Sequence, residues 1–283
     1  MESPVGQAIG VHGTDEQRAR LRAGRYCVGF AEAAHGSDLA AVETRGDIAG
    51  DEVVVTGAKV WLAHADAASA ALVLCCTEPA ASRYRNLSCV LVPLQDNNVE
   101  LRPLRTMTGD IEFFEAVFDG ARAPADNIIG GRGNGWRVAM TTLGFARIAR
   151  EMDPTEPSTG AELSATELER EFWDLVATAQ RHRRADDPLI RQQLAAAYAQ
   201  MRTLQLHTDA ETTSLLWGQY RQRLGELGVE IMGADAMVRP DGDAYATSRW
   251  QHALLSSPGE ALANGTQDIQ RTTVAERVLG LPQ

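Results

Sequence analysis

The terminal stretch NGTQDIQRTTVAERVLGLPQ, from Asn264 to Gln283, carries the pattern on which the fold assignment rests. An Asn-Gly pair is typical of a turn, and the Thr266 that follows it is a residue type that favours the N-cap of a helix. The next residues, from about Gln267 to Leu279, have a helical composition. Taken alone, the stretch predicts a loop followed by a capped terminal helix.

Upstream of this stretch, the hydrophobic period changes once and divides the chain. From Tyr26 to about Ile129, short runs rich in β-branched residues are separated by Gly, Pro, Asn and Asp, which predicts antiparallel strands. Three such runs are Asp51–Thr56, Ala70–Leu74 and Leu87–Val92. From about Gly135 onward, long segments rich in Ala, Leu, Gln and Arg predict helices. The sequence thus predicts an α+β fold, with a small β-barrel in residues 25–129 and a helical bundle in residues 130–283.

Composition excludes several classes of partner. The chain has 283 residues with 27 basic and 38 acidic side chains, and this net charge of −11 argues against binding to nucleic acid or to an anionic membrane surface. No stretch approaches the roughly 18 uninterrupted apolar residues that a membrane helix needs. The cysteines at positions 27, 75, 76 and 89 have no CxxC spacing, so neither a disulfide framework nor a metal site is indicated. A reducing cytoplasm fits this usage best.

The terminal stretch closely resembles the C-terminal signature of acyl-CoA dehydrogenases, in which a Gly-Thr pair and an Ile-Gln-Arg helix start bind flavin beside the reacting carbons of the substrate. The matching residues are Gly265, Thr266, Ile269, Gln270 and Arg271. The resemblance implies FAD as the cofactor. It also implies that Gly265, Thr266 and Asp268 lie beside this cofactor, because a helix start favours an anionic group.

A second resemblance to the same family lies in the β half. The segment Phe30–Asp38, which reads FAEAAHGSD, is followed in the family's order and spacing by Thr44, Gly50-Asp51, Gly57-Ala58-Lys59 and Trp61-Leu62-Ala63. A loop of small residues lets backbone amides approach a flavin ring, and the indole of Trp61 would pack along that ring. The resemblance implies cofactor contacts at Phe30, Ala31, Gly36, Ser37, Trp61, Ala63 and Gly233, and substrate contacts at Ser37 and Arg147.

Each motif also has a plain structural interpretation when it is taken singly. A Gly-Ser-Asp sequence is usually a turn, a tryptophan in a strand is usually a core residue, and Asn-Gly-Thr is usually a loop with an N-cap. The colinear order over nearly the whole chain is what favours the family assignment.

Several positions depart from the family pattern. Ala31 and Ala63 stand where the family carries hydroxyl side chains beside the flavin. Glu230 replaces a glutamine that contacts the adenine-side phosphate, and a carboxylate there repels a phosphate. The segment 182–188 replaces an Arg-x-x-Phe-Gly motif that reaches the flavin of a neighbouring subunit. These departures put cofactor binding by this chain alone in doubt.

The catalytic base is absent from both positions at which the family places a glutamate. These positions carry Asn264 and Ala146, and an amide does not accept the substrate's α-proton at neutral pH. His35 and His64 flank the expected flavin site, and histidine is the residue type most used for proton transfer near neutral pH. The favoured interpretation of both is nevertheless a surface or turn histidine without a catalytic role. The sequence therefore leaves open whether the chain is itself an enzyme.

The first residues complete the resemblance. Residues 1–24 resemble the segment that closes the family's N-terminal helical domain, which implies that most of this domain is missing. The tail 275–281 and the segment around Asp186-Asp187-Pro188 look most like the actinobacterial branch whose members form heteromers acting on steroid or other bulky acyl-CoA thioesters. In such assemblies a partner subunit can supply the base, and electron-transfer flavoprotein is the implied redox partner.

We therefore expect a base-deficient subunit of a heteromeric complex that carries out flavin-dependent α,β-dehydrogenation of acyl-CoA thioesters. Two alternatives remain at this point. One is a flavin-free structural or binding homologue. The other is a flavoenzyme that uses His35 or His64 for a changed reaction on a carrier-linked or CoA-linked acyl substrate.

Overall fold

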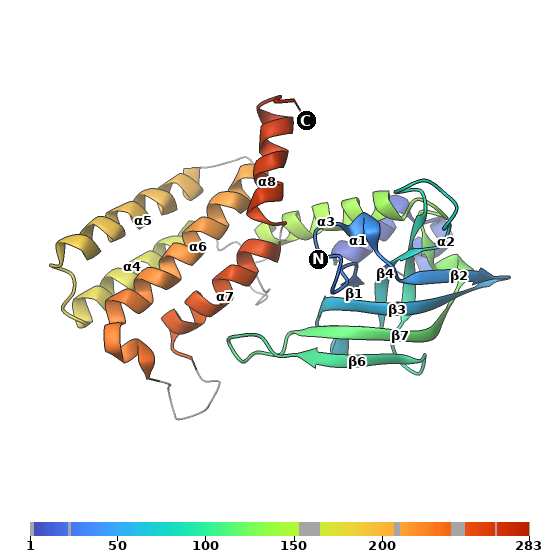
Figure 1. Cartoon of the computed structure of the whole chain (residues 1–283), viewed down its shortest axis with the longest axis horizontal. Coiled ribbons are helices and arrows are strands. Elements are labelled where there is room, and N and C mark those ends of the chain that lie inside the picture. Colours follow the sequence, from blue (N-terminus) through green and yellow to red (C-terminus); the bar gives the residue numbers. More distant parts are fainter. Residues whose placement is uncertain are drawn as a thin grey trace. The chain divides into compact units, whose positions relative to one another are not determined.

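The computed structural model describes residues 3–21, 24–152, 165–206, 210–238, 247–263 and 265–282 (Figure 1). The chain divides into two compact units. Unit 1 comprises Met1–Arg105 and Ile111–Ala149, and unit 2 comprises Thr106–Asp110 and Arg150–Gln283. The last boundary along the chain, between Ala149 and Arg150, falls inside helix α3 (Gly135–Met152).

Unit 1 is built on an eight-stranded sheet with the order β6-β7-β3-β2-β4-β5-β8, to which β1 adds by parallel pairing with β4. The strands are β1 (Tyr26–Gly29), β2 (Arg45–Ala49), β3 (Glu52–Ala63), β4 (Ala70–Cys76), β5 (Leu87–Pro93), β6 (Val99–Leu104), β7 (Phe113–Pro124) and β8 (Ile128–Ile129). Helices α1 (Pro4–His12) and α2 (Asp15–Leu21) and three 3₁₀ turns, Leu39–Ala41, Ala65–Ala67 and Ala125–Asn127, complete the unit with the first part of α3.

The predicted α+β class is confirmed, but the sheet of the described residues is not closed into a barrel. Its order has two free ends, β6 and β8, and its pairing is mixed rather than purely antiparallel. On β6, the exposed side chain of Arg102 makes ion pairs with Glu100 and with Glu115 of β7. Charged side chains of this kind keep an edge strand in water and oppose further pairing. The last strand, β8, has two residues.

The core of unit 1 lies on both faces of β4 and β5. Six of the seven residues of each strand are buried, which explains why their sequences are continuous apolar runs rather than alternating ones. One face packs with Val53 and Phe118, and the other packs with Phe30 and Ile9 of α1.

Burial suppresses the reactivity of three cysteines in this core. It raises the pKa of the Cys27 and Cys75 thiols to about 12 and the pKa of Cys89 well above its ordinary value. Because the thiolate is the reactive species, we expect iodoacetamide to modify the half-buried Cys76 first and the other three only after unfolding. Peptide mass mapping of a time course checks this, and early labelling of Cys75 in the folded protein would contradict it.

Unit 2 is a helical bundle in which α6 packs against α4, α5, α7 and α8 (Figure 1). The helices are α4 (Ala165–Arg181), α5 (Pro188–Leu206), α6 (Ala210–Met232), α7 (Arg249–Ala263) and α8 (Gln267–Thr273), with a 3₁₀ turn at Gly233–Met237 and a π-helical turn at Val274–Val278. Helices α6 and α7 approach closely because Gly225 has no side chain: a Cβ there would lie 2.6 Å from Leu254 Cα. Within the described residues, no helix is long and apolar enough to cross a membrane.

A largely buried ionic cluster joins three helices of this bundle. Arg221 of α6 donates to Glu260 Oε2 of α7 at 2.7 Å and to Glu171 Oε1 of α4 at 2.5 Å. Ser256 Oγ donates to Glu260 Oε1 at 2.7 Å. One guanidinium therefore compensates two carboxylates inside the bundle.

Candidate functional site

A tight turn follows β1 in unit 1 and holds the first group of predicted site residues. The Glu32 amide donates to the His35 carbonyl at 3.2 Å, and the His35 amide donates to the Glu32 carbonyl at 3.1 Å. Residues 33, 34, 36 and 37 are exposed. The backbone amides of these four residues donate no hydrogen bond to the part of the chain that the structure describes. The turn therefore presents several free backbone donors.

The end of β3 lies beside this turn and carries the second group. The Val60 amide donates to the Ala31 carbonyl at 2.9 Å. A β-bulge shifts the register with β7 between Lys59 and Leu62, and within it Trp61 has a φ of 63°. As a result Trp61 is 59% exposed, with its ring 5.6 Å from that of Phe113 in an edge contact. We call residues 31–37 and 60–64 together the rim.

A buried ion pair connects the two halves of the rim. Lys59, whose side chain is completely buried, donates from Nζ to Glu32 Oε1 at 2.8 Å and to the Phe30 carbonyl at 3.0 Å. Burial alone would raise the pKa of Glu32, but hydrogen bonds from the Glu43 amide, Lys59 and Thr44 reverse the shift and lower it. Burial lowers the pKa of Lys59, and Glu32 opposes that effect. Glu32 and Lys59 lie in the motifs quoted above, but no role was predicted for them from the sequence. A lysine within an apolar strand was the signal that could have indicated a buried ion pair.

The two candidate histidines do not form a hydrogen-bonded catalytic pair among the described residues. His35 Nε2 is buried without a hydrogen-bond partner and lies 3.6 Å from Glu43 Oε1. His64 is exposed and has a φ of 51°, and its amide donates to the Glu112 carbonyl at 2.9 Å. A catalytic use of either histidine stays a prediction.

The remaining predicted cofactor residues lie in unit 2. Thr266 caps α8, because its Oγ1 accepts from the Ile269 amide at 3.3 Å. Asp268 is exposed and pairs with Arg271 at 3.1 Å. Gly265 and Gly233 have φ values of 99° and 58°, which only glycine adopts readily.

The structure describes only one of the two positions at which the family carries its base. Ala146 lies half-buried on α3. Asn264 lies outside the described residues, and so does the side chain of Arg147. The structure therefore places Ala146 and does not describe Asn264. That the chain lacks a catalytic base stays a prediction.

Comparison with known proteins identifies the family. The chain is 35% identical over 301 aligned residues to the acyl-CoA dehydrogenase IpdE1 of Mycobacterium tuberculosis (strain ATCC 25618 / H37Rv), an alignment that covers 100% of this chain and 75% of that protein. The chain belongs to the acyl-CoA dehydrogenase family. Within it, residues 27–120 match the family model described as "Acyl-CoA dehydrogenase, middle domain".

Solved structures of acyl-CoA dehydrogenases have the same fold. The structure titled "Tcur3481-Tcur3483 steroid ACAD" has a TM-score of 0.83 and 25% identity, and the match covers 99% of this chain and 76% of that one. The ChsE4-ChsE5 complex from Mycobacterium tuberculosis has a TM-score of 0.80 at 22% identity, covering 100% of this chain and 77% of that one. The predicted family and fold class are thus confirmed.

Members of the acyl-CoA dehydrogenase family normally bind FAD, and the rim fits a flavin ring. The free amides of the turn match the polar edge of an isoalloxazine, and the exposed indole of Trp61 offers an apolar wall. A Cβ on Gly36 would meet nothing within 4 Å, so the turn is open to an approaching group. Ala31 and Ala63 add no hydroxyl donor to this set.

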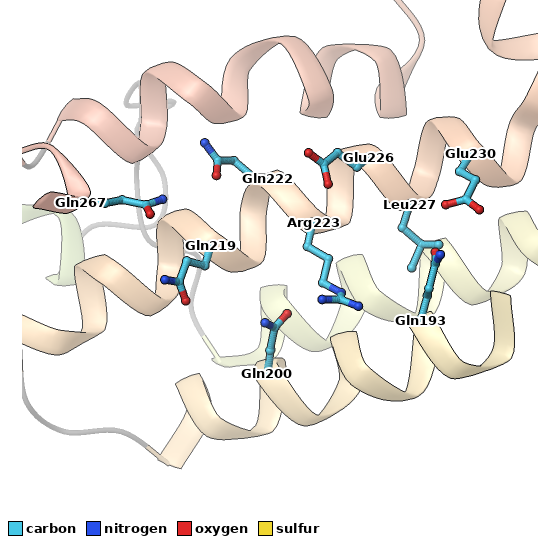
Figure 2. Close-up of a pocket in the computed structure, with 9 residues that line it drawn as sticks. All are labelled: Gln193, Gln200, Gln219, Gln222, Arg223, Glu226, Leu227, Glu230 and Gln267. Atoms are coloured by element: carbon cyan, nitrogen blue, oxygen red, sulfur yellow. The ribbon is translucent and has the colours of Figure 1, made fainter. Parts of the chain in front are cut away.

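Unit 2 also contains a polar groove of about 440 Å³ between α5 and α6 (Figure 2). It is lined by Gln193, Gln200, Gln219, Gln222, Arg223, Glu226, Leu227, Glu230 and Gln267. Figure 2 shows the Arg223 side chain extending from α6 toward α5 beside Gln200. Two carboxylates against one guanidinium give the lining a net negative charge, which is unfavourable for a phosphate.

Proposed function

We propose that this chain is a base-deficient subunit of a heteromeric acyl-CoA dehydrogenase that carries out flavin-dependent α,β-dehydrogenation of acyl-CoA thioesters. The observation that carries the proposal is a combination. The rim offers free amides and an exposed indole suited to a flavin, while the base position on α3 holds Ala146. A chain with the binding surface and without the base fits a supporting subunit.

The relatives support a partner subunit and a bulky substrate. The solved structure "Tcur3481-Tcur3483 steroid ACAD" pairs two proteins in its name and refers to a steroid. We infer a homologous, glutamate-bearing partner and a bulky acyl-CoA substrate, with electron-transfer flavoprotein as the electron acceptor. The described cysteines are all unpaired, and we place the complex in the cytoplasm.

Bound flavin would supply the acceptor for the substrate's β-hydride. The residues of this chain would bind the flavin and the substrate and orient them. The amides of the turn would hold the polar part of the flavin ring, and the exposed indole of Trp61 would pack on it and exclude water. Ser37 would contact the acyl-CoA. Thr266 and Asp268 of unit 2, taken by themselves, offer polar groups at the start of α8.

Mixing experiments test this assignment. We expect the purified chain to show a flavin spectrum with FAD but little acyl-CoA dehydrogenation with ferricenium as the acceptor. Activity should arise when a glutamate-bearing homologue is added, because the general base contributes about 10²- to 10⁴-fold. Full activity of the isolated chain would refute the base-deficient role.

A flavin-free binding homologue is the second candidate, and the missing hydroxyls at Ala31 and Ala63 favour it. The same visible spectrum separates the two candidates. A protein that stays colourless after incubation with FAD, both alone and with its partner, would support the flavin-free candidate. A shifted flavin absorbance that stays with the protein on gel filtration would exclude it.

A further inference from the structure

A single carboxylate closes the loop that carries Gly36 and Ser37. Glu32 Oε2 accepts from the Glu43 amide at 2.8 Å, and Glu32 Oε1 accepts from the Thr44 amide at 2.9 Å and the Thr44 hydroxyl at 2.6 Å. Residues 33–42 therefore form a loop whose two ends meet on the Glu32 side chain.

Lys59 attaches this closed loop to β3. Its ammonium binds Glu32 Oε1 and the Phe30 carbonyl, which is the point where the chain leaves β1. The next residue of β3 donates its amide to the Ala31 carbonyl, and Trp61 follows directly. The exposed amides of the turn and the exposed indole are thus tied to one buried pair of charges.

Packing alone does not account for a pair of this kind. Removing two charges from water is costly, and apolar residues of similar volume often stabilise a protein as well or better. The Glu32 carboxylate has four donors around it, and it therefore specifies one geometry for the segments that carry those donors. The donors come from Lys59 of β3 and from Glu43 and Thr44, the two residues that follow the loop.

We propose that Glu32 and Lys59 are positioning residues that hold the loop 33–42 and Trp61 as a preformed flavin-binding edge. This inference rests on the proposed function, because it assigns a task within the same site. Neither side chain is exposed enough to contact the cofactor itself: Lys59 is completely buried and Glu32 is 9% exposed. Their effect reaches the site through the backbone of the turn and through β3.

The test compares a neutral pair with the native pair. We expect the double variant Glu32→Gln/Lys59→Met to weaken FAD binding about tenfold or more, because small displacements of positioning groups have large effects. In the FAD-free protein, endoproteinase Asp-N should cut before the exposed Asp38 about tenfold faster, because the loop opens locally. The single variant Glu32→Gln leaves the buried Lys59 ammonium without its compensating charge, so it should show changes in the same direction that are at least as large.

Val53→Ala is the matched control. Val53 lies on the same strand, six positions before Lys59, and is fully buried in the core, so its truncation destabilises unit 1 without touching the loop. It should leave FAD affinity and Asp38 cleavage within about twofold of the native values. The inference fails if the folded double variant binds FAD and resists cleavage like the native chain, or if Val53→Ala changes both equally. If the native chain binds no FAD either alone or with its partner, the proposed function fails, and the cleavage rates alone decide whether the pair holds the loop.

Discussion

Introducing a glutamate at position 146 is expected to raise acyl-CoA dehydrogenation by the FAD-loaded chain about 100-fold or more, because a positioned general base contributes about 10²- to 10⁴-fold. Ala146 lies on α3, at the position where the family resemblance places the base, and in the same unit as the rim. Reduction of ferricenium with a bulky acyl-CoA measures the rate.

Ala146→Gln is the matched control for Ala146→Glu. The two side chains have nearly the same size, and only the carboxylate can accept the substrate's α-proton. Both variants should bind FAD with the affinity of the native chain, so that any difference in rate reports the base. Equal rates for the two variants at equal flavin content would contradict the idea that a missing base keeps this chain inactive.

Replacing Arg221 by methionine is expected to lower the free energy of unfolding by about 3–5 kcal/mol. The guanidinium contacts Glu171 and Glu260 inside the bundle, and its loss leaves two carboxylates that are largely buried without a compensating charge. Urea unfolding followed by the helical circular dichroism signal measures the change.

Two further variants show whether charge compensation is the cause. The triple variant Arg221→Met/Glu171→Gln/Glu260→Gln removes all three charges and should recover most of the lost stability. The control Arg202→Met makes the same substitution on the exposed face of α5, where the arginine lies in solvent. It should change the free energy of unfolding by less than about 0.5 kcal/mol. Native stability of Arg221→Met would show that the cluster contributes little.

Some features of this protein follow from local sequence. The runs in β4 and β5 are continuous and apolar, and both strands are buried on both faces. Thr266 is a favoured N-cap residue, and it caps α8. Such features depend on neighbours within a few positions, which is why patterns of residue type predict them.

Local sequence patterns could not predict whether the sheet closes into a barrel. Strand runs indicate that a sheet forms, but closure depends on which strands meet at its edges. The charged edge strand β6 and the two-residue β8 end the sheet without meeting in the described structure.

The exposure of Trp61 is the clearest example of a feature that sequence patterns do not predict. Residues 59 and 61 have the same parity, so a regular strand would place both on one face. The bulge breaks this alternation, and Lys59 and Leu62 are buried while Trp61 is exposed. The bulge arises from the pairing of β3 with β7, which lies more than forty positions away along the chain.

The sequence by itself thus determined the family, the α+β class and the absence of a glutamate at position 146, because these depend on residue identity and order. Only the tertiary structure decided that Glu32 and Lys59 form a buried pair, that the turn keeps free amides and that Trp61 faces outward. These properties depend on burial and on hydrogen bonds between segments far apart in the chain, which the order of residues does not display.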